Sequence, residues 1–212
     1  MIYQLAEIVK DVKVALDENM TSEGLLALED VETLSMEDII ESKVVEAVRR
    51  VESSAPVNML ESGQNLVDAI FWKEKGSGFV VLPGDFMRLM VFKMSDWERV
   101  VTDAITVDDP MYAKQSSRYK GIRGNKQKPV CAIVNRPEGR VLEFYSCDNE
   151  SATMEMGVYR PYPKIDEYKG VEISKRCYMA VIYTLGALVL MTYGESEKAS
   201  VLLELSKSVI EQ

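Results

Sequence analysis

The sequence predicts an α+β fold in which helices from both ends of the chain form a bundle and an antiparallel, β-rich module is inserted between them. Two observations lead to this prediction. Apolar residues recur at helical spacing near both ends of the 212-residue chain, whereas turn signals and short apolar runs fill the middle. The short runs follow one another without helical patterns between them, which favours antiparallel pairing over a Rossmann-like parallel sheet.

Residues 1–72 are interpreted as the N-terminal helical part. The clearest pattern, SMEDIIESKVVEAVRRVESS, begins at Ser35, the expected N-cap, and Pro56 ends it. A shorter amphipathic pattern precedes it near the N-terminus. The run NLVDAIFW (65–72) is expected to add a third short helix.

Residues 73–169 are interpreted as the β-rich module. Strands are expected at PVCAIV (129–134), RVLEFYS (140–146) and ATMEMGVY (152–159), and NRPEG (135–139) has the composition of a hairpin loop. A further strand–turn–strand pattern spans residues 80–101. The module also contains a long basic loop at 107–128, which we expect to be extended because it has few apolar residues.

Residues 170–212 are interpreted as a C-terminal helical hairpin. The apolar run CYMAVIYTLGALVLMTY (177–193) is shorter than the ~20 residues that a bilayer requires, so it predicts a buried core helix and no membrane partner. Ser174 is its expected cap. Gly194 ends it, and the short turn that follows predicts antiparallel packing against a second amphipathic helix, which lies in residues 196–211.

The chain lacks the usual residues of catalytic and metal sites. It contains no histidine, no CxxC pair and no phosphate-binding loop motif, so we expect no catalysis, no metal and no cofactor. Acidic pairs such as Asp108–Asp109 are interpreted as solvated surface. The three cysteines, Cys131, Cys147 and Cys177, are interpreted as small buried residues without disulfides.

Charge is distributed unevenly along the chain. Residues 1–62 contain 14 acidic and 5 basic residues, whereas KQSSRYKGIRGNKQK (114–128) contains six basic residues and no acidic one. This basic segment could contact a nucleic-acid backbone, dock on the acidic surface of a neighbouring copy, or be a solvated loop without a partner. The candidate interface residues are Arg118, Lys120, Arg123, Lys126, Lys128 and Arg88.

The stretch LPGDFMRLMVF (82–92) has its own physical interpretation. Pro83 and Gly84 predict a turn, where Asp85 is expected to accept hydrogen bonds from nearby backbone amides. Arg88 stands among apolar residues and is expected on the solvent-facing or partner-facing side of the strand. The three methionines of the strand, Met87, Met90 and Met94, are expected to fill gaps in the core.

This stretch also resembles a strand entry of the head–tail adaptor, or ring, proteins of short-tailed phages. The resemblance is to the tail tubular protein A type, whose pattern is matched by Leu82, Pro83, Asp85, Phe86 and Arg88. The order of helices, strands and helices is similar over most of the chain. The style of the sequence also resembles ring proteins of crAss-like phages.

The resemblance implies a structural virion protein and not an enzyme. Proteins of this family form a ring, commonly of twelve copies, beneath the portal vertex, where they join the portal to the tail and line the channel through which double-stranded DNA passes. Expected partners are therefore further copies, the portal and other tail proteins. The protein would be made in the host cytoplasm and located in the virion. Alternatives are another tail or portal-associated component, or a cellular ligand-binding domain or enzyme.

Overall fold

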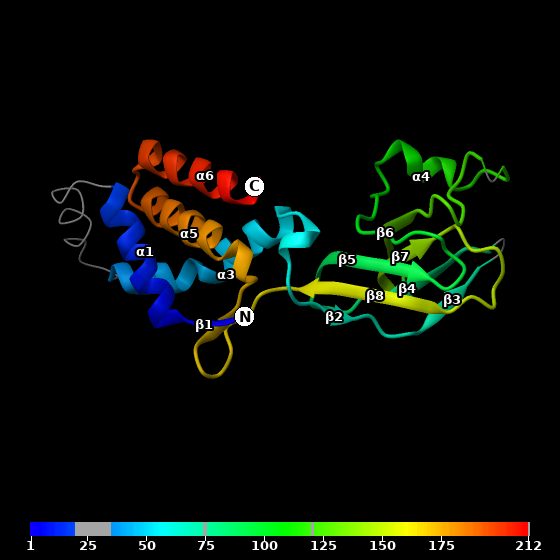
Figure 1. The fold of residues 1–212 in the computed structure, drawn as a ribbon, viewed down its shortest axis with the longest axis horizontal. Coiled ribbons are helices and arrows are strands. Elements are labelled where there is room, and N and C mark those ends of the chain that lie inside the picture. The colour runs from blue at the N-terminus through cyan, green and yellow to red at the C-terminus, as the bar shows by residue number, and fades with distance from the viewer. Residues whose placement is uncertain (20–34, 74–75, 120, 212) are drawn as a thin grey trace. The chain divides into compact units, whose positions relative to one another are not determined.

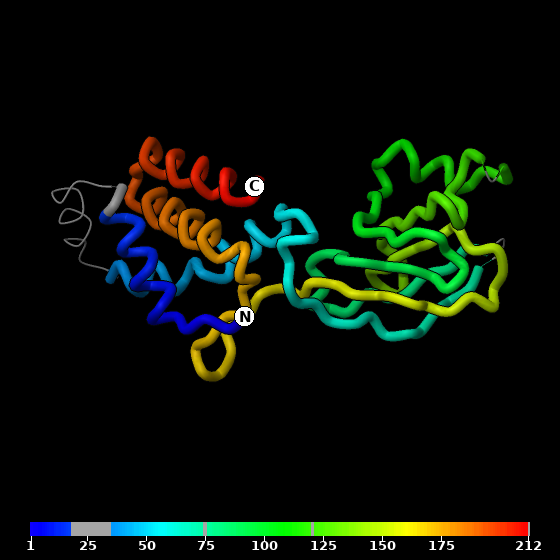
Figure 2. Tube along the Cα trace, in the orientation of Figure 1, coloured from blue at the N-terminus to red at the C-terminus, as the bar shows by residue number. Residues whose placement is uncertain are grey.

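The structure, a computed structural model, describes residues 1–19, 35–73, 76–119 and 121–211. The chain forms two compact units, which we call the helical unit (Met1–Ser62 and Tyr162–Gln212) and the β unit (Gly63–Pro161). The chain leaves the helical unit once and returns to it once, so the β unit is an insertion (Figure 2). The predicted α+β fold with N- and C-terminal helices is confirmed.

The described part of the helical unit consists of four long helices, two short 3₁₀ turns and a two-stranded ribbon. The helices and turns are α1 (Leu5–Asn19), α3 (Met36–Ser54), η1 (Val57–Met59), η3 (Lys175–Cys177), α5 (Tyr178–Thr192) and α6 (Ser196–Ile210). The ribbon pairs β1 (Ile2–Gln4) with β9 (Gly170–Glu172) in antiparallel orientation. The other three helices all pack against α5 (Figure 1), which explains why α5 is apolar over most of its surface.

Helix α5 confirms the expectation of a buried core helix. No helix in the described ranges is long and apolar enough to cross a membrane. At Gly186 the missing side chain lets α6 approach closely, since a Cβ atom there would lie 3.0 Å from Leu202 Cδ1. The hydroxyl groups of Thr184 and Ser206 are 2.8 Å apart, and Ser206 also donates to the Ala180 carbonyl. These contacts confirm the antiparallel hairpin of α5 and α6.

The helix starts were predicted correctly in one case and wrongly in another. Ser35 caps α3 as predicted, in a reciprocal capping box with Asp38. Ser174 begins the turn before α5, but its side chain makes no capping hydrogen bond. Two carboxylates perform that role, because Glu52 accepts from the Ser174 amide at 2.8 Å and Glu61 accepts from the next amide at 3.0 Å.

The described residues of the β unit form two antiparallel sheets and one short helix, α4 (Pro110–Lys114). The first sheet has the order β2–β8–β5, with β2 (Gln64–Asn65), β8 (Met154–Pro161) and β5 (Phe86–Met94). The second has the order β3–β4–β7–β6, with β3 (Ile70–Trp72), β4 (Gly78–Val81), β7 (Gly139–Phe144) and β6 (Cys131–Arg136). Strands β6 and β7 form the predicted hairpin around Pro137 and Glu138.

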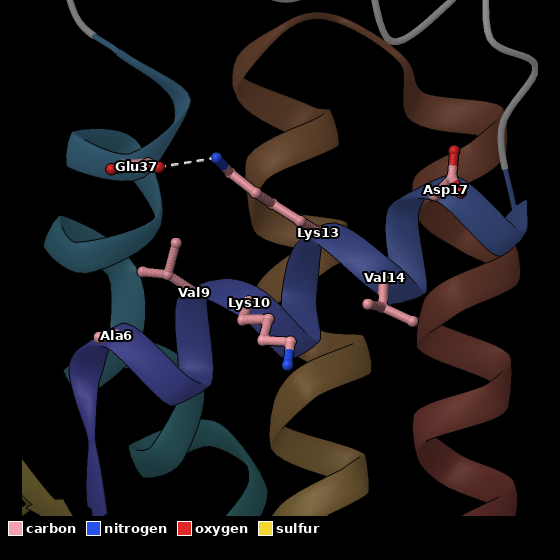
Figure 3. A pocket seen from close by; sticks show the side chains of 7 residues that line it. All are labelled: Ala6, Val9, Lys10, Lys13, Val14, Asp17 and Glu37. Carbon is pink, nitrogen blue, oxygen red and sulfur yellow. Dashed lines mark hydrogen bonds and ion pairs between the residues drawn. The ribbon is translucent and has the colours of Figure 1, made fainter.

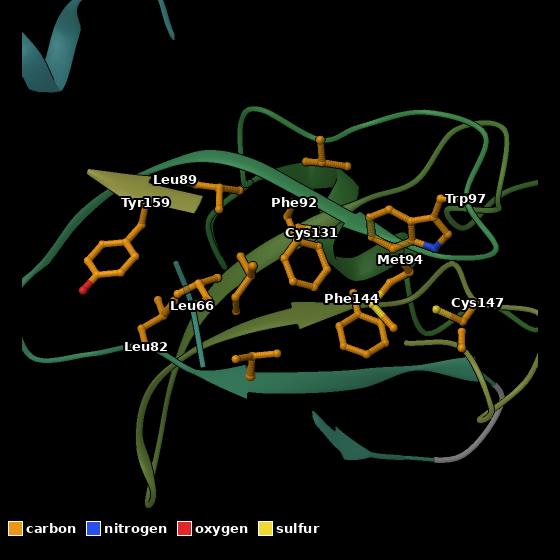
Figure 4. Close-up of a cluster of buried hydrophobic side chains, with 14 of the residues drawn as sticks. Leu66, Leu82, Leu89, Phe92, Met94, Trp97, Cys131, Phe144, Cys147 and Tyr159 are labelled. Carbon is orange, nitrogen blue, oxygen red and sulfur yellow. The ribbon is translucent and has the colours of Figure 1, made fainter. Parts of the chain in front are cut away.

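Both sheets contribute side chains to one apolar core (Figure 4). Its centre is aromatic: the ring centroid of Phe92 lies 5.6 Å from that of Trp97 and 5.9 Å from that of Phe144. Phe92 comes from β5 of the first sheet and Phe144 from β7 of the second, so these rings join the two sheets. Both tryptophans of the chain, Trp72 and Trp97, lie in the β unit, so tryptophan fluorescence reports on this unit alone.

The boundaries of the units differ from those expected. The first helical part ends at Ser62 instead of residue 72, and the chain rejoins the helical unit at Tyr162 instead of residue 170. The third short helix expected at 65–72 is wrong, since residues 70–72 form β3. Pairing with β4 explains the difference, because it stacks the Phe71 ring on the Phe79 ring with centroids 5.0 Å apart.

Candidate functional site

The residues that carry the family resemblance build the start of β5. Leu82 and Phe86 are buried, and the Phe86 amide donates to the Pro83 carbonyl to close the expected turn. Asp85 accepts a hydrogen bond from the Tyr159 hydroxyl at 2.9 Å, instead of the expected bonds from nearby backbone amides. The Phe86 and Tyr159 rings are stacked. The motif therefore fixes the turn against β8 and is structural in this chain.

The expected position of Arg88 on the solvent-facing or partner-facing side of β5 stays a prediction. Arg88 is half-buried in β5 and stands opposite the buried Arg160 of β8 in the strand register. Met90 and Met94 are buried and fill the core as predicted, and Met87 is half-buried. The interface role of Arg88 likewise stays a prediction, at a half-buried position.

The basic segment is folded against the second sheet, so the expectation of an extended loop at 107–128 is wrong. Asp109 caps α4 by accepting from the Met111 amide at 2.7 Å. The side chain of Gln115 is buried and ties the segment to itself, donating to the Met111 carbonyl at 2.8 Å and accepting from the Gly124 amide at 2.9 Å. These side-chain hydrogen bonds hold the chain in place where apolar residues are few.

The candidate interface residues of the segment have different environments. Arg118 and Lys128 are exposed, as an interface requires. Lys126 is also exposed and lies 3.7 Å from a carboxylate oxygen of Asp148 in the same unit. Lys120 lies outside the described residues. Arg123 differs from these, because it turns inward and lines a pocket.

The pocket lies between α4, the segment that follows it and the second sheet, and it has a volume of about 740 Å³. Most of the residues that line it have polar or charged side chains. The residues are Lys73, Ser77, Tyr112, Ala113, Gln115, Ser116, Arg123, Arg136, Glu143 and Tyr145. A volume of this size with convergent polar groups is typical of binding sites for small molecules.

Glu143 of β7 is the polar centre of the pocket wall. Only 2% of it is exposed. Its Oε1 accepts from Lys73 Nζ at 3.0 Å and from Arg136 Nε at 2.6 Å. Its Oε2 accepts from the Tyr145 hydroxyl. Each oxygen is thus satisfied, and the two cations are held at fixed positions by one carboxylate.

Two further features concern the three cations of the pocket lining, Lys73, Arg136 and Arg123. The Phe79 ring lies 5.6 Å from Lys73 Nζ and 4.8 Å from the Arg136 guanidinium carbon, which adds cation–π attraction to the anchoring of both. The Nε atom of Arg123 is buried and has no hydrogen-bond partner among the described residues. The lining therefore combines three cations with one carboxylate, Glu143.

The ionisation of Glu143 is stabilised by its neighbours. Burial alone would raise its pKa, but hydrogen bonds from Tyr145, Lys73 and Arg136 lower the pKa below the usual value of 4.5. Burial and the same carboxylate raise the pKa of Tyr145 far above its usual range, so the phenol stays neutral.

We predict that the stability of the β unit falls in acid. A carboxylate whose folded pKa is lowered stabilises the fold above its unfolded pKa, and this contribution disappears as the pH falls through the folded pKa. The midpoint of urea unfolding, followed by tryptophan fluorescence, should therefore decrease below pH 4.5 in the wild type. A Glu143→Gln variant should show a smaller decrease over the same range, and an equal decrease would contradict the prediction.

The hollow on the helical unit and the buried cysteines bring together fewer charged groups than the pocket beside Glu143. An open hollow of about 430 Å³ lies on α1 and α3. Figure 3 shows the side chains that line it, among which Lys13 Nζ and Glu37 Oε1 form an ion pair at 2.7 Å. Burial raises the pKa of Cys131, and it raises that of Cys147 to about 12, so neither is a nucleophile at neutral pH. All three cysteines are buried, as predicted. Within the described ranges, no group of three or more His, Cys, Asp or Glu residues could hold a metal ion.

Sequence reasoning identified Arg123 as a candidate contact but missed the pocket to which it belongs. Glu143, Lys73 and Arg136 were not singled out. Arg136 and Glu143 belong to the same predicted hairpin, but Lys73 lies 70 residues before Glu143 and only the strand pairing brings it to them. A comparison with protein-family models finds no match, and neither does a comparison with curated proteins.

Proposed function

We propose that this chain is a structural virion protein, a head–tail adaptor that forms a ring between the portal and the tail. Double-stranded DNA would pass through the ring without specific binding. The observation that carries the proposal is the division of charge between the two units. The helical unit has 21 acidic and 11 basic residues, net −10, whereas the β unit has 13 and 14, net +1. The insertion of the β unit between terminal helices also agrees with the layout that the resemblance implies.

A charge division of this kind suits head-to-tail association. Rings are built from heterologous contacts, in which one face of a copy meets a different face of the next copy. The exposed cations Arg118 and Lys128 of one β unit would face exposed acids of the next helical unit, such as Glu37 and Asp38 on α3. Complementary charges at such a contact favour correct orientation and fast assembly.

The mass of the protein in solution tests the proposal. We expect a monomer, or a weakly associated species, that assembles into a closed ring in the presence of a purified portal of a short-tailed phage. Assembly should be weaker at high salt, since salt screens exposed charges. A stable monomer that is indifferent to the portal at both salt concentrations would overturn the adaptor proposal.

We predict that the double variant Arg118→Gln, Lys128→Gln assembles about tenfold more weakly, because two exposed ion pairs contribute about 0.2–1 kcal/mol each. The measurement is the protein concentration at half-maximal ring formation. The matched control is Arg99→Gln, Lys164→Gln, which removes the same charge from exposed positions outside the basic segment. If both double variants weaken assembly equally, the contact depends on net charge and not on this segment.

A further inference from the structure

We infer that the pocket beside Glu143 binds an organic anion through a carboxylate or phosphate group, with Arg123 as its main ligand. This inference is independent of the adaptor proposal. It rests on an excess of cations that the protein itself does not neutralise, on an arginine nitrogen that is buried without a partner, and on a cavity beside both.

The excess of cations is larger than the pocket lining alone suggests. Arg123 also borders a second hollow of about 550 Å³, whose lining contains Lys114 and Lys128 but no acidic residue. Around Arg123, the residues that line the two hollows therefore include five cations and one carboxylate. That carboxylate, Glu143, is already bonded to Lys73 and Arg136. The positive charge of Arg123 itself is left without a counter-charge in either lining.

The charge, the N–H donors and the partial burial of Arg123 make it the expected ligand of the anion. Its guanidinium is charged at any physiological pH and has five N–H donors that match the oxygens of a carboxylate or phosphate. Arg123 is half-buried and lines both hollows, so an anion held there would accept from the part of the guanidinium that borders them, while its buried Nε is closed to water. We therefore expect Arg123, which is half-buried beside a cavity, to bind an anion. Arg118 is exposed, so water solvates its guanidinium.

The other walls define what kind of anion fits. Lys73 and Arg136 are held in place by Glu143 and the Phe79 ring, so the anion would meet cations that are already positioned. Tyr145 remains neutral and adds no opposing charge. Its ring meets that of Tyr112 edge to face, with centroids 6.4 Å apart, which gives the pocket an aromatic side. The volume exceeds that of inorganic phosphate, so the natural ligand should have an organic body.

Thermal unfolding of the full chain tests the inference, with tryptophan fluorescence as the readout. Inorganic phosphate and glutarate, a simple dicarboxylate, would each be titrated at constant ionic strength, with chloride as the balancing ion. We expect a saturable rise in the Tm of the wild type. Arg123→Gln should weaken the apparent affinity at least about tenfold, since a hydrogen bond to a charged group contributes about 1.5–3 kcal/mol.

The control separates the pocket from general charge effects. Arg118→Gln makes the same chemical change five positions away, on an exposed residue, and should keep the wild-type response. Without anion, Arg123→Gln should be at least as stable as the wild type, because it removes an unpartnered buried donor and a repelling cation. An unfolded Arg123→Gln protein would contradict that reasoning. A wild type without response to either anion, or an equal response in both variants, would overturn the inference.

The anionic group could also come from an acidic side chain of a second copy. Sedimentation with and without phosphate distinguishes a free anion from an acidic side chain of a second copy. If a free anion fills the site, phosphate should leave the mass unchanged. If a side chain of another copy fills it, phosphate and Arg123→Gln should both reduce self-association. Sedimentation therefore identifies the source of the anionic group. Whether Arg123 binds an anion at all is decided by the thermal titration described above.

Discussion

Replacing Glu143 by glutamine should destabilise the β unit by about 3 kcal/mol at neutral pH. Removing one partner of a buried ion pair costs about 3–5 kcal/mol, because the remaining charge stays buried without compensation. We take the lower end, since the side chains of Lys73 and Arg136 keep 30% and 27% of their exposure and water can partly solvate them. The side chain of Glu143 itself is only 3% exposed.

The geometry shows why an amide cannot replace the carboxylate. The two oxygens of Glu143 accept from two cations and from the Tyr145 hydroxyl, so every neighbour is a donor. A glutamine could turn its N–H₂ group only toward the Tyr145 hydroxyl, which would then have to accept and would lose the acceptor for its own hydrogen, and the charge that holds the two cations together would be lost. Burial of the site makes each unmatched donor costly.

Urea unfolding followed by tryptophan fluorescence measures this effect, since both tryptophans belong to the β unit. The matched control is Glu138→Gln, an exposed carboxylate in the loop between β6 and β7, which should change the stability by less than about 0.5 kcal/mol. A double variant, Glu143→Gln with Lys73→Gln, should lose less than the sum of the single changes, because it removes partners of one network. Equal losses for Glu143→Gln and Glu138→Gln would contradict the argument.

The helices and the β6–β7 hairpin could be predicted from the sequence because their signals are local. The apolar stripe and the Ser35 cap of α3 lie within one stretch of chain, as do Pro137 and Glu138 of the hairpin loop. Strand β3 could not be predicted in the same way. An apolar run of three residues, such as Ile70–Trp72, fits a helix or a strand, and its pairing with β4 decides between them.

The candidate site depends on pairing that the sequence does not display. In RVLEFYS the alternation puts Glu143 on the face opposite Leu142 and Phe144, which by itself predicts a solvated strand face. The strand register instead places Glu143 beside Phe79 of β4 and Ala132 of β6, and the segment around α4 covers that face. The charge of the basic segment was evident, but nothing in the sequence indicated that Arg123 lines a pocket whereas Arg118 and Lys128 are exposed.

Gly76→Ala should cost the β unit about 3–5 kcal/mol, although it leaves the charge unaltered. A Cβ atom at this position would lie 1.9 Å from the carbonyl oxygen of Cys147 and 2.8 Å from its carbonyl carbon. Both are backbone atoms, so no side chain can move aside. The φ angle of +69° adds about 1–2 kcal/mol for a residue with a Cβ, and overpacking adds about 1–3 kcal/mol.

Two variants separate the collision from the backbone conformation. Asparagine tolerates a left-handed φ but carries a Cβ, so Gly76→Asn should remain nearly as damaging as Gly76→Ala. Gly84→Ala places a methyl group where no atom lies within 4 Å and should change the stability little. If Gly76→Asn recovered most of the stability, the conformation and not the contact with Cys147 would be responsible.

The same contact links the core to the candidate site, which gives Gly76→Ala a second expected effect. The Cys147 amide donates to the Gly76 carbonyl at 3.1 Å, and the Lys73 amide donates to the Ser77 carbonyl at 2.8 Å. Moving Gly76 away from Cys147 should therefore also displace Lys73, whose ammonium group anchors Glu143. We expect the protein that remains folded to bind phosphate more weakly than the wild type, in the thermal titration used for Arg123→Gln. An unchanged affinity in a destabilised Gly76→Ala protein would show that the pocket is held by the hairpin of β6 and β7 alone.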